Sequence, residues 1–284
     1  MRTFDLTDGI RSIYENGSFS LPRWERYTDS RMPGITELCR ADLQDCLNAG
    51  LSFEENYLPV LRAVYEKEQE IREITDHFRA VTDRLEETIL SVFGRTVDAD
   101  LVLYLGLCSG AGWAVQLNGR ETVLLGVEKI LELHWGGLSE MKALILHELG
   151  HLYQEQYGVL RREFSTGRDR FLWQLFTEGI AMVFEQETVG DPQFYHQGPQ
   201  WTSWCAAHLS RIAEAFSGDL DTMSFENQRF FGDWVRFEGQ PDTGYYLGAR
   251  FVRELLTETP FDDLLSWEIG TVRNAFERFC AGIC

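Results

Sequence analysis

The most regular hydrophobic pattern lies between residues 138 and 158, where apolar side chains recur at every third or fourth position. The apolar positions are Met141, Leu144, Ile145, Leu149, Leu152 and Tyr153. This spacing places them along one face of an α-helix, which we expect to pack against a protein core. Ser139 suits the position that caps the start of such a helix, and Gly158 suits the position just beyond its end. The segment therefore predicts one helix with defined ends.

Helical periodicity also dominates the chain before this segment. Residues 35 to 50 predict a helix that ends at Gly50, and the charged, periodic stretch from 53 to 93 predicts one or two long helices. Residues 1 to 34 are mixed in pattern, because glycines and prolines interrupt any long element. We therefore expect an N-terminal helical region over residues 1–97.

From Asp98 the pattern changes to short runs typical of β-strands, and Asn118-Gly119 is a dipeptide favoured in tight hairpin turns. Helical periodicity then resumes after residue 158. It extends over residues 170–188, 201–216, 244–257 and 261–280. The sequence thus predicts a mostly helical α+β fold, in which a small β-sheet precedes the 138–158 helix and a second region spans residues 98–284.

The 138–158 helix carries the pattern H-E-x-x-H at His147, Glu148 and His151. Two histidines four positions apart project from the same face of a helix, so both imidazoles can bind one Zn²⁺, while the adjacent glutamate can act as a general base. The alternative is a solvent-exposed helix that holds these residues by chance. The run Ala-Leu-Ile-Leu directly before His147 favours a buried metal-binding helix over an exposed one.

Glu178 is the candidate third ligand, because it lies within an apolar helical run of Trp, Phe, Ile and Met. A buried carboxylate needs a partner, and a Zn²⁺ ion held by two neutral imidazoles provides a strong one. The alternative is an exposed helix glutamate, although Glu185 and Glu187 are better placed for solvent.

The combination of H-E-L-G-H with a downstream T-E-G-I-A resembles the gluzincins, a group of zinc peptidases that includes thermolysin-like and aminopeptidase-like enzymes. The resemblance extends over about residues 98–260 and is closest to small bacterial members of the group. It implies a zincin-like catalytic unit with one Zn²⁺ per chain, held by His147, His151 and Glu178. It further implies that Glu148 is the general base.

A weaker similarity lies at residues 245–249, Y-Y-L-G-A, which resembles the Y-x-x-G-A segment of aminopeptidase-like members. In those enzymes the first tyrosine stabilises the developing oxyanion, so the resemblance assigns that role to Tyr245. The alternative is structural, because a tyrosine pair at a helix start commonly packs a core with its hydroxyl groups at the rim.

Several departures from the family patterns narrow the resemblance. His151 and Glu178 are 27 positions apart (178 − 151), a longer interval than usual in the two subfamilies. The Gly-x-Met-Glu-Asn stretch that binds a substrate amino terminus is missing, and Met182 replaces an aspartate that steadies a ligand histidine in thermolysin-like enzymes. The extended metzincin motif is also absent, since it would require glycine at 154 and histidine at 157. These departures argue against an aminopeptidase and against a metzincin.

Two other histidines, His196 and His208, are rival metal ligands. A histidine on an aromatic-rich helix, such as His208, is more often a core residue whose ring nitrogens are hydrogen-bonded. The pair Cys280 and Cys284 is another candidate metal site, but helix fraying and packing explain its spacing better. We expect Glu178 rather than any of these to complete the zinc site.

Charge and composition limit the partners of the protein. The net charge of −19 argues against a nucleic-acid ligand, which requires a basic surface. The first residues show no secretory signal pattern, and no apolar run approaches the length of a membrane span. The six cysteines show no C-x-x-C pair and are most simply reduced thiols. We therefore expect a cytoplasmic protein, and the sequence leaves its oligomeric state open.

Together these features predict a zinc-dependent metallopeptidase, a hydrolase that cleaves peptide bonds of a peptide or protein substrate. We expect the substrate to lie extended against the strand region 101–127, because a peptide can pair with a sheet edge as an added strand. The alternative is a non-catalytic zinc-binding regulatory or interaction protein that retains a zincin fold. A fourth protein ligand would favour that alternative, whereas an open coordination position would favour the enzyme.

Overall fold

The computed structural model describes residues 1–232 and 234–283, so Asp233 and Cys284 lie outside it. The suggested pairing of Cys280 with Cys284 therefore falls outside the described residues. The chain divides into two compact units, Met1–Glu148 and Leu149–Cys284. The division falls within helix α7 (Leu138–Tyr157), which carries the H-E-x-x-H pattern. The boundary predicted between residues 97 and 98 separates the N-terminal helical region from the expected catalytic region, and it stays a prediction.

A four-stranded mixed sheet forms the centre of the N-terminal unit, in the order β1-β4-β6-β5. Its strands are β1 (Arg2–Asp5), β4 (Asp100–Tyr104), β5 (Gly112–Leu117) and β6 (Arg120–Gly126). β1, β4 and β6 run parallel, whereas β5 is antiparallel to β6 and lies at the edge. Every residue of the central strand β4 is buried, as expected for a strand covered on both faces.

The turn between β5 and β6 confirms the hairpin predicted from the sequence. Asn118 and Gly119 have φ values of 52° and 77°, and positive φ at both central residues suits a turn that follows the strand twist. Asparagine and glycine adopt this conformation more easily than other residues. The turn therefore establishes the register that puts Gly112 opposite Leu125.

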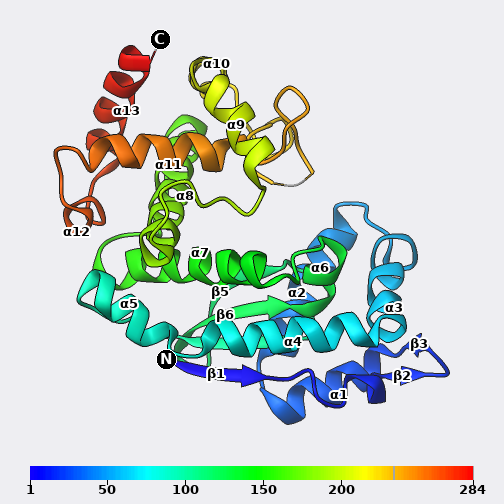
Figure 1. Cartoon of the computed structure of the whole chain (residues 1–284). Coiled ribbons are helices and arrows are strands. Elements are labelled where there is room, and N and C mark those ends of the chain that lie inside the picture. The colour runs from blue at the N-terminus through cyan, green and yellow to red at the C-terminus, as the bar shows by residue number, and fades with distance from the viewer. Residues whose placement is uncertain (233, 284) are drawn as a thin grey trace. The chain divides into compact units, whose positions relative to one another are not determined.

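Helices surround this sheet (Figure 1). The one or two long helices predicted over residues 53–93 are in fact three shorter α-helices. Breaks fall at Lys67 and at Asp83-Arg84, where Arg84 has a φ of 58° that no α-helix accommodates. The elements are η1 (Ile10–Ile13), β2 (Tyr14–Glu15), β3 (Ser18–Phe19), α1 (Leu21–Arg31), α2 (Ile35–Asn48), η2 (Phe53–Tyr57), α3 (Leu58–Glu66), α4 (Glu68–Thr82), α5 (Leu85–Phe93) and α6 (Val127–Glu132).

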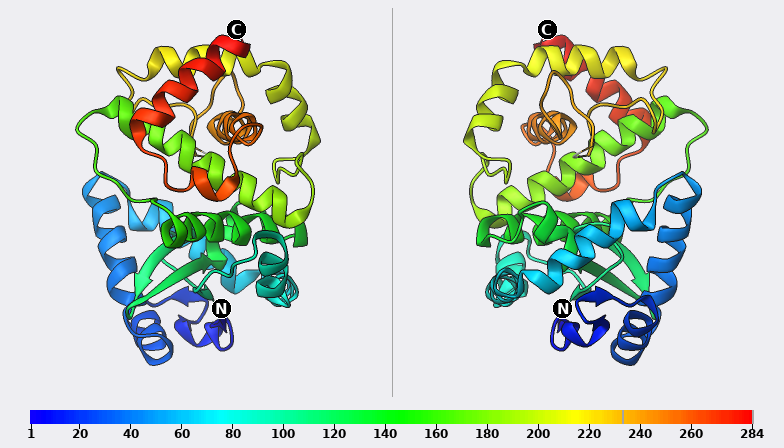
Figure 2. Two further views of the ribbon diagram at one scale, coloured as in Figure 1. Left: turned by 90° about the vertical axis from the view of Figure 1, so that its left-hand side faces the viewer. Right: turned by 90° about the vertical axis from the view of Figure 1, so that its right-hand side faces the viewer.

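The C-terminal unit is helical throughout its described elements. Beyond the second half of α7 it contains α8 (Gly167–Val189), α9 (Pro199–Ala207), α10 (Leu209–Asp219), α11 (Thr243–Leu255), α12 (Phe261–Leu264) and α13 (Ile269–Ile283). Figure 2 shows α11 end-on, with α8, α9, α10 and α13 around it. All the helices predicted after residue 158 are present, with two of them divided. The mostly helical α+β fold predicted from the sequence is therefore confirmed.

The ends of α7 differ in part from the prediction. The helix begins at Leu138, so Ser139 lies inside its first turn and the predicted cap is wrong. The helix ends at Tyr157, and Gly158 follows it as predicted. A methyl group at Gly158 would lie 2.2 Å from the carbonyl oxygen of Leu265, so glycine is required there for close backbone approach. Among the described residues, no helix is both long enough and apolar enough to cross a bilayer.

Candidate metal centre

Helix α7 presents the H-E-x-x-H residues on the less buried side of an otherwise buried helix. Leu146, Leu149 and Leu152 are fully buried, as the apolar periodicity requires. The side chains of His147, Glu148 and His151 are only partly buried. Their positions thus combine an apolar setting with partial exposure to solvent.

Helix α8 approaches α7 closely because α7 has a glycine at the contact. A methyl group at Gly150 would lie 2.8 Å from Cα and 3.1 Å from the carbonyl oxygen of Ala181, which leaves no space for a side chain. Gly150 is the neighbour of His151, and Ala181 lies one turn after Glu178. The close contact of the two backbones therefore lets a glutamate 27 positions away reach His151.

His147, His151 and Glu178 form a group whose possible ligand atoms all lie within 4.8 Å of one another. Nε2 of His151 and Oε2 of Glu178 are 3.3 Å apart, and their side chains are 15% and 14% exposed. Two ligands bound tetrahedrally to zinc at the usual bond lengths lie about 3.4 Å apart. The spacing of this pair therefore fits one shared zinc ion, and two imidazoles with one carboxylate are donors that zinc accepts.

Glu148 does not belong to this group of ligand atoms. Its side chain instead lies against the first residue of the edge strand β5. A methyl group at Gly112 would lie 2.9 Å from Cδ1 of Leu144, 3.1 Å from Cγ and 3.3 Å from Oε1 of Glu148, so only a glycine leaves room for the Glu148 side chain here. The arrangement places the predicted base beside the open edge of the sheet.

Tyr245 belongs to the first turn of α11, and α11 crosses α8 (Figure 1). The two helices touch through glycines, since a methyl group at Gly179 would lie 2.3 Å from the carbonyl oxygen of Gly248. Glu178 precedes Gly179, and Tyr245 is three residues, or about one helical turn, before Gly248. The partly buried Tyr245 ring packs edge-on against Phe231 at 5.9 Å between centroids. Tyr245 therefore lies about one helical turn from the crossing of α8 and α11, and Glu178 directly precedes the α8 glycine at that crossing.

The rival histidines do not join the metal-ligand group within residues 1–232 and 234–283. The ring of His208 stacks on Trp204 at 4.2 Å between centroids, and its Nδ1 lies 2.7 Å from the carbonyl oxygen of Trp204. His208 therefore has the hydrogen-bonded packing role that the sequence offered as the alternative to metal binding. His196 also lies outside the group.

Glu185 was expected to be better placed for solvent, and this expectation is wrong. It follows Glu178 by two turns on α8 and is almost completely buried, and this burial raises the pKa of its carboxyl well above the ordinary value. Glu128 on α6 is also fully buried, which raises its pKa to about 7. Glu128 sits in an apolar run, V-E-K-I-L, but one acid among hydrophobic residues is too common a pattern to identify a site. Gly112 was likewise missed, because its contact with Glu148 is a tertiary one.

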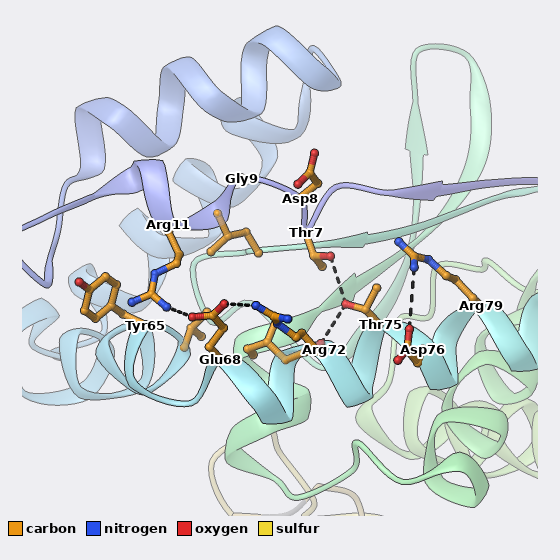
Figure 3. Close-up of a pocket in the computed structure, with 13 residues that line it drawn as sticks. Thr7, Asp8, Gly9, Arg11, Tyr65, Glu68, Arg72, Thr75, Asp76 and Arg79 are labelled. Carbon is orange, nitrogen blue, oxygen red and sulfur yellow. Dashed lines mark hydrogen bonds and ion pairs between the residues drawn. The ribbon is translucent and has the colours of Figure 1, made fainter.

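A separate hollow of about 470 Å³ lies between residues 7–11 and helices α3 and α4 (Figure 3). Three arginines line it, and each is already paired with a carboxylate. Arg11 and Arg72 both contact Glu68, and Arg79 contacts Asp5. Because these guanidinium groups are neutralised within the protein, the hollow offers little attraction for an anionic ligand and contains none of the predicted site residues.

In comparisons with known proteins, no family model, no curated protein and no solved structure matches the chain.

Proposed function

We propose that this protein is a zinc-dependent peptidase of the gluzincin type, with one Zn²⁺ per chain bound by His147, His151 and Glu178. The observation that carries the proposal is the convergence of two helix histidines and a distant carboxylate to within 4.8 Å. Surface acids often cluster without a metal, but imidazoles that meet a carboxylate on a partly buried helix face are a typical zinc donor set. A bound zinc ion would lower the pKa of water and polarise a carbonyl group.

Glu148 is proposed as the general base. Its carboxylate would accept a proton from the water that attacks the scissile carbonyl carbon. As the C–N bond breaks, it would return that proton to the nitrogen of the leaving amine, so the products are a carboxylic acid and an amine. Its position next to His147 and its contact with Gly112 support this role.

Tyr245 is proposed to donate a hydrogen bond to the oxyanion that develops on the attacked carbonyl group. Such a donor stabilises the transition state more than the substrate and thereby raises the rate. The support for this role is its place about one turn from the α8–α11 crossing at Gly179 and Gly248.

The edge strand β5 is the proposed binding surface for the substrate. It has β6 as its one neighbour in the sheet, and four of its six residues are half-buried. An extended peptide can add to such an edge through main-chain hydrogen bonds, which require no particular sequence. Since β5 begins at Gly112 against Glu148, a peptide on this edge would pass the general base. We therefore propose an endopeptidase or an enzyme of narrow specificity that acts within a chain.

A cytoplasmic location is part of the proposal. The cysteines at positions 39, 46, 108 and 205 are free thiols. Reduced thiols suit the cytoplasm, where glutathione and thioredoxin keep disulfides open.

The deciding experiment combines metal analysis with peptide cleavage by wild type and Glu148→Gln. We expect one zinc per chain in both proteins and cleavage of amino-terminally blocked peptides by the wild type alone. The glutamine is isosteric but cannot accept the proton, so zinc and fold should persist while hydrolysis stops. Zinc binding without cleavage of any peptide would instead support the regulatory alternative, and loss of zinc in Glu148→Gln would refute the base assignment.

A further inference from the structure

Glu128 is a carboxylate enclosed entirely within the N-terminal unit. Its side chain is 0% exposed, and both of its oxygens accept backbone hydrogen bonds. The N–H of Gly106 donates to Oε2 at 2.8 Å, and the N–H of Cys108 donates to Oε1 at 3.0 Å. Acidic groups are costly to bury without hydrogen bonds, and here the loop backbone satisfies both oxygens of the acid.

The loop between β4 and β5 is shaped around this carboxylate. A methyl group at Gly106 would lie 2.5 Å from Oε1 of Glu128, and one at Gly126 would lie 3.0 Å from the same atom. Cys108 has a φ of 61°, a conformation that non-glycine residues adopt only when the surroundings impose it. The glycines give the carboxylate room, and the carboxylate in turn holds the strained residue in place.

The same loop ends at the proposed general base. The N–H of Gly126 donates to the carbonyl oxygen of Ala111 at 3.0 Å, and Gly112 then pairs with Leu125 as the first residue of β5. Gly112 lies beside the side chain of Glu148, since a methyl group on it would come within 3.1 Å of Cγ of that residue. A continuous set of contacts therefore runs from Glu128, through the loop at residues 106–112, to Glu148.

We propose that Glu128 is a positioning residue for Glu148: by binding the backbone of the 106–112 loop, it holds Gly112 against the side chain of the general base. This inference rests on the proposed function, since it assigns Glu148 its catalytic role. A displacement of about 1 Å at a reacting group can reduce a rate about a hundredfold, so a buried anchor some residues away can matter for catalysis.

The first test compares Glu128→Gln with Glu132→Gln, an exposed glutamate on the same helix. The glutamine side chain keeps one acceptor but turns a donor toward the second N–H, so the loop should loosen. We expect faster amide hydrogen exchange over residues 106–112 and a kcat about tenfold to a hundredfold lower. KM and zinc content should stay near the wild-type values, and the control should match the wild type in every measurement.

Gly106→Ala probes the same contact if Glu128→Gln fails to fold, because its methyl group displaces the carboxylate without removing it. Gly218→Ala is the control, since no atom lies within 4 Å of a methyl group at this position, which is outside the loop. We expect Gly106→Ala to reproduce the faster exchange and the lower kcat. A merely structural defect would reduce zinc content, or alter kcat and KM together.

A double-mutant cycle then tests whether the anchor acts through Glu148. Gly112→Ala puts a methyl group 2.9 Å from Leu144 and 3.1 Å from Cγ of Glu148, so both side chains must shift. Its effect on kcat should therefore overlap with that of Glu128→Gln rather than add to it. Additive effects would overturn the inference, as would an unchanged kcat in a Glu128→Gln protein whose loop exchanges faster. These outcomes leave the proposed function intact. A wild-type protein that binds zinc but cleaves no peptide would refute the proposed function, and with it the catalytic meaning of the anchor.

Discussion

Glu178 and Glu128 both lie among hydrophobic residues, yet their surroundings differ in kind. Glu178 is partly exposed and faces the imidazole of His151 across 3.3 Å. Glu128 is sealed from solvent and faces backbone N–H groups. Two partly accessible imidazoles beside a carboxylate can bind a cation together with it. Backbone N–H groups instead donate hydrogen bonds to the acid, so it needs no cation. An acid within an apolar run therefore identifies a metal ligand only when other ligands converge on it.

The largest expected effect is a difference in zinc binding between variants of Glu178 and variants of Glu128. Glu178→Ala removes a proposed direct ligand, so zinc affinity should fall by more than about a hundredfold, the upper range for residues that only support a ligand. Glu128→Ala should keep one zinc per chain wherever it folds. Metal analysis after dialysis against a weak chelator gives the comparison. Undiminished zinc in Glu178→Ala would remove this residue from the site.

The second expected effect concerns the pH dependence of stability. Burial raises the pKa of Glu128 from 4.5 to about 7, so the folded protein keeps this proton at pH values where the unfolded chain has released it. The stabilisation is complete below about pH 4.5 and is lost as the pH rises through 7, with a span on the order of 3 kcal/mol. Urea denaturation of wild type and Glu128→Gln across this range measures it. Identical pH slopes in the two proteins would contradict the prediction.

A smaller effect is expected at the helix crossing that supports Glu178. Gly179→Ala puts a methyl group 2.3 Å from the carbonyl oxygen of Gly248, so the helices must separate, at a cost of about 1–3 kcal/mol in unfolding free energy. Gly218→Ala is the control, because no atom lies within 4 Å of a methyl group on this α10 residue. It should be neutral or slightly stabilising. Thermal denaturation of both variants with zinc removed isolates the packing effect.

The smallest expected effect concerns Tyr245. If its hydroxyl group stabilises an oxyanion, Tyr245→Phe should reduce kcat about tenfold or more while KM changes little. Tyr246→Phe is the neighbouring control, since its ring packs on Tyr195 and Trp201 within the core. Equal rates for both variants would return Tyr245 to a packing role.

The sequence by itself determined the features that depend on neighbours along the chain. The apolar period of residues 138–158 predicted α7, and the four-residue spacing placed His147 and His151 on one face, because a helix repeats every 3.6 residues. The hairpin at Asn118-Gly119 followed from the preference of these residues for positive φ. Such features need no knowledge of distant parts of the chain.

Tertiary structure alone decided what came together from far apart. The N-terminal region was expected to be helical, yet residues 2–5 pair with residues 100–103 of β4, and four residues are too few for a clear strand pattern. Gly150 and Ala181 decide that Glu178 reaches His151, while Gly112 decides where the side chain of Glu148 lies. These contacts depend on which backbones can approach within van der Waals distance. That property belongs to the packed elements and leaves no periodic signal in the sequence.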